Sequence, residues 1–220
     1  ESLKNDYDLF ISGSDQVWSP RCVGFDPAYF LTFADDKQKY SYAASFAVPT
    51  LPDEFIDEYK KRLNGFQKFS VREPSGEKLV KELTGRTAET HLDPTLLISA
   101  DEWKKIAVSK IDKPYILIFT ANPAVSLVDF ALKLSKEKNL PVYCINDAPH
   151  PVSHGINYIV APTVEEFVGC FKNAEYVVTN SFHGTAFSVI FNKNHFCGIQ
   201  EQKRKKHPLR RSFEKSWNQP

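Results

Sequence analysis

Strand-like and helix-like segments alternate along this chain, and that alternation is the feature that most restricts its fold. Short apolar runs at 7–13 (YDLFISG), 112–120 (DKPYILIFT) and 175–180 (EYVVTN) have the composition of buried strands. Segments such as 52–66 (PDEFIDEYKKRLNGF) and 74–85 (PSGEKLVKELTG) have the spacing and end signals of helices. Apolar strands separated by helices form parallel sheets that helices cover on both faces. The sequence therefore predicts an α/β protein.

Two such alternating runs meet near residues 99–113, after a Pro-broken apolar stretch at 90–99 (THLDPTLLIS). Further strands are expected at 39–47 and 68–73, and further helices at 163–174 and 184–192. We predict two doubly wound Rossmann-like domains, 1–98 and 99–200, with a cleft between them, followed by a basic tail at 201–220 that packs back on the first domain. Ligands of such sheets bind outside the carboxyl ends of the strands.

The composition excludes several classes of protein. The net charge of +1 argues against a general nucleic-acid binder. No apolar run approaches the ~20 residues of a membrane span, and the first residues are polar, so we expect a cytoplasmic protein. The chain contains no methionine, which predicts a fragment, with the first domain incomplete at its start, or an edited sequence.

The basic tail allows two interpretations. Its lysines and arginines are Lys203, Arg204, Lys205, Lys206, Arg210 and Arg211. They form a solvated face, or they attract the phosphates of a lipid-linked substrate or of an anionic membrane. The second interpretation predicts peripheral contact with the inner face of the membrane.

No metal site or disulfide framework is expected. The cysteines are widely separated and form no CxxC pair: Cys22, Cys144, Cys170 and Cys197. We expect four reduced thiols. His150 and His154 have no acid or cysteine at ligand spacing. The chain also lacks a Walker phosphate loop and the GxGxxG, HExxH and GxSxG motifs.

The most informative junction is at 174–191 (AEYVVTNSFHGTAFSVIF), where a strand leads directly into a polar turn and a helix. Asn180, Ser181 and His183 follow the strand, and Gly184 lets the backbone approach a ligand or the sheet. Ser181 is placed to cap the helix, with His183 in its first turn. Free amides at that helix start would attract phosphate. The alternative is a capping serine with a structural histidine.

Two other junctions place polar residues after a strand. In SVREPSG, Arg72 precedes a helix and could grip phosphate or carboxylate with two hydrogen bonds, or it could pair with Glu73. In SGSDQVW, Ser14, Asp15 and Gln16 offer polar groups and Trp18 a ring, a mixture that suits a sugar. The alternative for this segment is an Asx-type turn with a core tryptophan.

The order of five segments resembles the polysaccharide pyruvyl transferases: YDLFISGSDQVW, YSYAASFA, SVREPSGEKLVKEL, LDPTLLI and AEYVVTNSFHGTAFSVIFNK. The resemblance covers about Asp6 to Lys193. It implies a GT-B-like fold and transfer of a pyruvyl group from phosphoenolpyruvate to two hydroxyls of a sugar, giving a cyclic ketal. The implied partners are this donor and a sugar or lipid-linked saccharide acceptor, with no cofactor and no metal. Such enzymes act in the synthesis of cell-wall or extracellular polysaccharide.

The resemblance also assigns roles to residues. Arg72 would bind the donor's anionic groups, and His183 would protonate the donor or assist departure of its phosphate. Amides around Ser181 to Gly184 would stabilise that phosphate, with Asn180, Ser14 and Gln16 as further substrate contacts. Asp15 would contact or deprotonate an acceptor hydroxyl. Two positions depart from the pattern: Ala47 stands where glycine is frequent, and Asn194 where proline is frequent.

Two other functions stay open. A GT-B-type nucleotide-sugar glycosyltransferase would need an acid for the ribose in the second domain, and Glu165 or Glu166 could serve. A non-catalytic glycan-binding relative would keep the site without the reaction.

Overall fold

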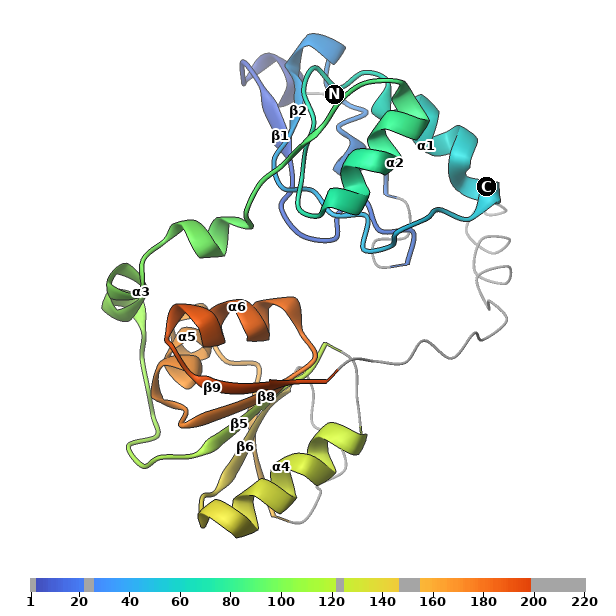
Figure 1. The fold of residues 1–220 in the computed structure, drawn as a ribbon. Coiled ribbons are helices and arrows are strands. Elements are labelled where there is room, and N and C mark those ends of the chain that lie inside the picture. Colours follow the sequence, from blue (N-terminus) through green and yellow to red (C-terminus); the bar gives the residue numbers. More distant parts are fainter. Residues whose placement is uncertain (1–2, 22–25, 122–124, 147–154, 199–220) are drawn as a thin grey trace, which may run out of the picture. The chain divides into compact units, whose positions relative to one another are not determined.

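The structure is a computed structural model that describes residues 3–21, 26–121, 125–146 and 155–198. The chain divides into two compact units, Glu1–Glu102 and Trp103–Pro220 (Figure 1). The short helix α3, Ala100–Ile106, crosses from one to the other.

The first unit contains short parallel strands. Its strands and α-helices are β1 Phe10–Ser12, β2 Lys39–Ser41, α1 Ile56–Leu63, β3 Ser70–Val71, α2 Pro74–Thr84 and β4 Glu89–Thr90. Its 3-10 helices are η1 Leu3–Asn5, η2 Pro27–Phe30, η3 Asp36–Gln38, η4 Asp53–Phe55 and η5 Pro94–Leu97. β1 pairs with β2 and β3 with β4, all in parallel, and isolated bridges such as Ala44 to Val71 link the two pairs. The strands therefore run side by side in chain order.

The core of the first unit is aromatic. Trp18, Phe30, Tyr59 and Phe66 are fully buried, and the Trp18 ring lies 5.4 Å from that of Phe66. The Tyr59 hydroxyl donates to the Trp18 carbonyl at 2.7 Å, so its polar end is satisfied. This cluster fixes the loop that follows β1.

The strand expected at 39–47 is wrong beyond Ser41. Ala43 and Ala47 have φ of 44° and 54°, values that a β-strand does not contain. The backbone of this segment instead bonds to the residues around β3: the Ala43 amide donates to the Ser70 hydroxyl at 2.9 Å. A positive φ favours glycine, so the alanine at position 47 carries a strain that a glycine would avoid.

The second unit is an α/β domain with a five-stranded parallel sheet in the order β7-β6-β5-β8-β9. Its elements are β5 Ile116–Phe119, α4 Val125–Lys138, β6 Val142–Asn146, β7 Ile156–Val160, α5 Val164–Asn173, β8 Tyr176–Thr179, α6 Phe182–Ile190 and β9 Asn194–Cys197. The chain moves outward in one direction from β5 and then starts again at β8 on its other side. The sheet is therefore doubly wound, with its topological switch point between β5 and β8.

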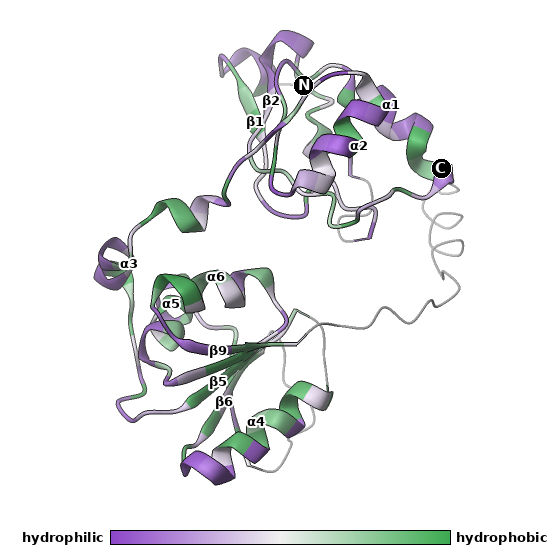
Figure 2. Ribbon diagram, in the orientation of Figure 1, coloured by the Kyte–Doolittle hydropathy of each residue, from purple (hydrophilic) through white to green (hydrophobic). Residues whose placement is uncertain are grey.

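Helices cover both faces of this sheet, as the apolar strands predict. Ile116 and Ile118 pack on the α4 side, whereas Tyr115 and Leu117 pack with residues of α5 and α6. Figure 1 shows α4 on one face and α5 and α6 on the other, and Figure 2 shows the hydrophobic strands between them. A strand buried on both faces needs a continuous apolar run, which the sequence supplies at 115–118.

The helix ends agree with the sequence signals. Pro74 begins α2 and Gly85 ends it in the left-handed conformation, with φ of 72°. Thr163 caps α5 and forms a capping box with Glu166. Ser181 caps α6. That helix begins at Phe182, two residues before the segment expected from its sequence.

Candidate functional site

The switch point of the second unit brings together the ends of β5 and β8. The Asn180 side-chain oxygen accepts a hydrogen bond from the Ala121 amide at 2.9 Å, which ties the two loops together. The Thr179 hydroxyl donates to the Phe119 carbonyl at 2.6 Å and accepts from the Ser181 amide at 3.0 Å. The predicted site residues Asn180 and Ser181 thus lie where ligands of doubly wound sheets bind.

His183 lies half-buried in the first turn of α6, as the sequence predicts. The neighbouring Ser181 hydroxyl accepts a hydrogen bond from the Gly184 amide at 3.4 Å. Two amides predicted to face a phosphate, those of Ser181 and Gly184, therefore already donate within the chain. Ser181 therefore caps α6, and His183 is held in the first turn of that helix, two residues after the cap.

Gly184 is required by packing against the sheet. A Cβ added at this residue would lie 2.1 Å from Thr179 Oγ1 and 3.2 Å from the Phe119 ring. The sequence allows two roles for Gly184, close approach of the backbone to a ligand or to the sheet. The structure shows the second role, because α6 packs closely on the sheet at this residue.

We expect Gly184→Ala to lower the free energy of unfolding by about 1–3 kcal/mol, as overpacking of a tight contact does. Thr179 cannot move aside without losing its bond to Phe119. Urea unfolding measures the loss. The control is the double variant with Thr179→Ala: relief of the clash should make its loss smaller than the sum of the two single losses. Additive losses would show that the clash is not the cause.

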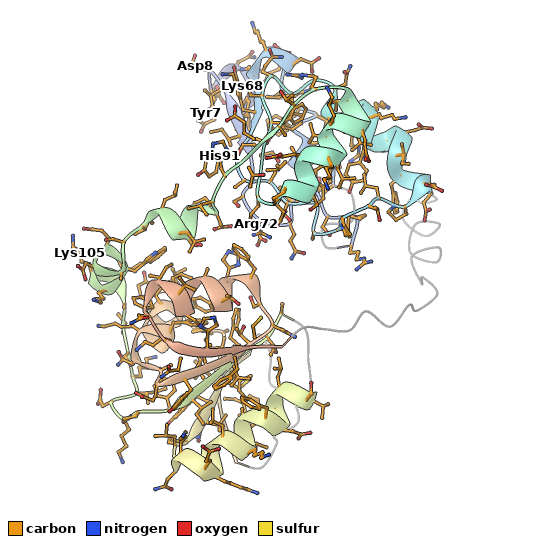
Figure 3. The ribbon with its side chains drawn as sticks, in the orientation of Figure 1. Tyr7, Asp8, Lys68, Arg72, His91 and Lys105 are labelled. Atoms are coloured by element: carbon orange, nitrogen blue, oxygen red, sulfur yellow. The ribbon has the colours of Figure 1, made fainter. Side chains whose placement is uncertain are left out.

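In the first unit, Arg72 directly follows β3, two residues before the start of α2 (Figure 3), and contacts three carboxylates. Its Nε donates to Glu73 at 2.9 Å, and its Nη1 donates to Asp15 at 3.1 Å and to Asp93 at 3.2 Å. The pairing with Glu73 was one of the two interpretations of the sequence. The three carboxylates outnumber the single guanidinium, so these four side chains together carry a net negative charge.

Asp93 was not assigned a role from the sequence, although it lies in the segment LDPTLLI. Its side chain is 3% exposed, whereas that of Asp15 is 55% exposed. The Ser14 hydroxyl lies 2.9 Å from its Oδ2 and 2.8 Å from the Ala43 carbonyl. Ser14, Asp15, Arg72 and Asp93 therefore form one cluster, here called the Arg72 cluster, at the carboxyl ends of β1, β3 and β4.

The pKa values of the cluster reflect these contacts. Burial lowers the pKa of Arg72, but its hydrogen bond to Glu73 and the charges of Glu73 and Asp15 outweigh burial and raise it. Burial raises the pKa of Asp93, but hydrogen bonds from Thr95, Ser14 and Arg72 outweigh burial and lower it. The Asp93 carboxylate thus stabilises the fold above the ordinary pKa of an aspartate, and this contribution is lost as the pH falls through its folded-state pKa.

The loop at 13–18 combines a tight backbone with a buried ring. Gly13 has φ of 120°, and a Cβ there would lie 2.1 Å from the Tyr42 carbonyl oxygen, so only glycine fits. Trp18 is 0% exposed, which corrects the prediction that it offers a stacking face to a sugar. Gln16 is half-buried in the same loop. The core tryptophan that was the alternative interpretation is confirmed.

The first unit also contains a cavity that the sequence did not indicate. Its volume is about 510 Å³, within the range of small-ligand sites. Tyr40, Tyr42, Lys68 and His91 line it, and Figure 3 labels the last two. The His91 Nδ1 lies 3.0 Å from the Ser70 hydroxyl. These residues come from three separate segments, so no local motif could have joined them.

Glu165 and Glu166, the two acids that could bind a ribose in a nucleotide-sugar glycosyltransferase, lie in the first turn of α5. Glu166 accepts from the Thr163 amide at 3.2 Å and pairs with Lys110. Hydrogen bonds at the helix start, with the Thr163 side chain among them, lower the pKa of Glu165. Both side chains are therefore engaged at the start of a helix.

Some of the predicted features lie outside the described residues, namely Cys22, His150, His154 and the basic tail. Within the described part of the chain, Cys144, Cys170 and Cys197 are free thiols. The same part contains no group of three or more His, Cys, Asp or Glu side chains that could hold a metal ion. Among its helices, none has the length and apolar character needed to cross a membrane.

The second unit is a doubly wound α/β domain with polar side chains at its switch point. The chain is therefore an α/β protein. The family model for polysaccharide pyruvyl transferase matches residues 1–197, so the chain belongs to that family. Membership indicates a transferase of polysaccharide biosynthesis. No curated protein and no solved structure matches the chain.

Proposed function

We propose that this protein transfers a pyruvyl group from phosphoenolpyruvate to two hydroxyls of a sugar in a polysaccharide or its precursor. The product would be a pyruvate ketal. The observation that carries the proposal is the family membership of residues 1–197, together with His183 in the first turn of α6. The resemblance adds a GT-B-like pair of Rossmann-like domains to the proposal.

His183 is the proposed proton donor, because imidazole side chains exchange protons near neutral pH. Protonation turns the donor's methylene carbon into a methyl group, and the adjacent carbon gains oxocarbenium character. One sugar oxygen bonds to that carbon, and a second sugar oxygen then replaces phosphate. Of the two protons that the sugar hydroxyls lose, one balances the new methyl group and the other leaves with phosphate.

Arg72 is the proposed ligand of the donor's phosphate or carboxylate, and its present partners define what binding requires. Asp15 and Glu73, whose side chains are 55% and 37% exposed, are the partners that an incoming anion can replace. Displacement of Asp15 would leave its carboxylate available to an acceptor hydroxyl. Donor binding would then prepare the group that receives the acceptor's proton.

The remaining predicted residues have supporting roles in this proposal. Asn180 and Ser181 hold the loop that carries His183, Gly184 seats its helix, and Ser14 and Gln16 belong to the loop that carries Asp15. Phosphoenolpyruvate enters the scheme as a donor substrate, and no cofactor enters it. The acceptor is a sugar or a lipid-linked saccharide, and we place the reaction at the cytoplasmic face of the membrane.

The donor distinguishes this function from that of a nucleotide-sugar glycosyltransferase. At about 100 times its Kd, a ligand that binds only the folded state stabilises it by about 2.7 kcal/mol. We therefore expect phosphoenolpyruvate to raise the melting temperature and uridine diphosphate to leave it unchanged. Phosphate release with galactoside or mannosamine acceptors, and mass spectrometry of the product, would separate an enzyme from a binding relative. Stabilisation by uridine diphosphate alone would contradict the proposal.

A further inference from the structure

Asp93 differs from the other acids around Arg72 in how completely it is held. Its Oδ2 lies 2.9 Å from the Ser14 hydroxyl and 3.2 Å from Arg72 Nη1. Its Oδ1 accepts from the Thr95 amide at 3.1 Å and from the Thr95 hydroxyl at 2.9 Å. Both carboxylate oxygens thus face two donors each, which fixes the orientation of the whole group.

Asp93 is more deeply buried than Asp15 and Glu73, the other two acids that contact Arg72. Its side chain is 3% exposed and that of Arg72 is 4% exposed, so the attraction between them is weakly screened by water. The side chains of Asp15 and Glu73 are 55% and 37% exposed, so a solute can reach both, and Glu73 also accepts from the Ser45 hydroxyl at 2.9 Å. Asp93 cannot leave without abandoning four hydrogen-bond donors. The guanidinium therefore has one permanent counter-ion and two replaceable ones.

We propose that Asp93 is a positioning residue that holds the Arg72 guanidinium in the orientation that binds the donor. This role rests on the proposed function, because it assigns Arg72 to phosphoenolpyruvate. Asp93 itself does not touch the donor. Its contact with Ser14 also ties the loop of Asp15 to the same anchor, so one buried carboxylate orients side chains from two different loops.

Asp93→Asn tests the role because an amide cannot copy the carboxylate here. Arg72 Nη1 beside one oxygen and the Thr95 amide beside the other can only donate, so the Asn NH2 group must face a donor in either orientation. Loss of the negative charge also weakens the hold on Arg72. We expect the Kd for phosphoenolpyruvate, measured by calorimetry, to rise at least about tenfold, and the KM for the donor to rise more than kcat falls.

Asp26→Asn is the matched control. Asp26 also precedes a proline and caps a 3-10 helix, and its Oδ1 accepts from the Ala28 amide at 2.8 Å. It therefore shares the capping role of Asp93 but faces solvent, and it is not one of the three carboxylates described as partners of Arg72. Its Kd for phosphoenolpyruvate should equal that of the wild type. A similar weakening in both variants would show that replacing a capping aspartate by asparagine, and not the hold on Arg72, is responsible.

Ser14→Ala keeps the test decisive if Asp93→Asn does not fold. It removes one donor to Asp93 and leaves the ion pair with Arg72, so we expect a smaller rise in the Kd for phosphoenolpyruvate. A wild-type Kd in Asp93→Asn, or in Ser14→Ala where the first variant is unfolded, would overturn the role of Asp93 alone. Failure of the wild-type protein to bind phosphoenolpyruvate would overturn the proposed function and this role with it.

Discussion

Replacement of His183 by alanine should lower turnover by about 10²- to 10⁴-fold, the range that general acid catalysis supplies. The variant should stay folded, because α6 is capped by Ser181 and seated by Gly184. Phosphate release with phosphoenolpyruvate and a saccharide acceptor measures the loss. The melting temperature checks the fold.

His195→Ala is the control for this variant. His195 lies exposed on β9 of the same unit, with its Nδ1 3.2 Å from the Lys193 carbonyl. Its removal should leave turnover unchanged. Wild-type turnover in His183→Ala would remove this histidine from the mechanism, and equal losses in both variants would point to a general effect on the second unit.

Arg72→Ala should destabilise the first unit by about 3–5 kcal/mol, because removal of one partner leaves the buried carboxylate of Asp93 without its cation. Donor binding should weaken in the fraction that remains folded. The sequence alone predicts only the second effect, since it gives no sign of the buried acid. Urea unfolding measures the first effect and calorimetry with phosphoenolpyruvate the second.

Two further variants separate the causes. Adding Asp93→Asn to Arg72→Ala removes the uncompensated charge, so the double variant should recover part of the lost stability while donor binding stays weak. Arg62→Ala removes an arginine paired at 2.6 Å with Glu58, whose side chain is 42% exposed, and it should cost less than Arg72→Ala because it leaves no buried carboxylate unpaired. A loss in Arg72→Ala no larger than in Arg62→Ala would contradict the role of the buried pair.

Many elements could be predicted because their signals are local. The apolar run of β5, the capping box of Thr163 and Glu166, and the proline and glycine at the ends of α2 all act within a few residues. The placement of His183 after a serine cap belongs to the same class, because a helix start is defined by its own first turn.

Predictions failed where distant contacts override local preference. The segment after Ser41 has the composition of a strand, but its amides bond to Ser70 instead and two of its alanines adopt positive φ. Trp18 has the polar neighbours of a sugar-binding ring, yet the aromatic core around Tyr59 buries it completely. Neither outcome has a signal within the segment itself.

The amino-acid sequence by itself determined the α/β class, the order and caps of most helices, and the position of a histidine at a strand end, because hydrophobic period and capping act over single turns. The tertiary structure decided which acids surround Arg72. Asp15 and Asp93 lie 57 and 21 residues from it along the chain and meet it only because parallel strands bring their carboxyl ends together. Contacts made by that convergence depend on the whole fold, and so does the chemistry proposed for them.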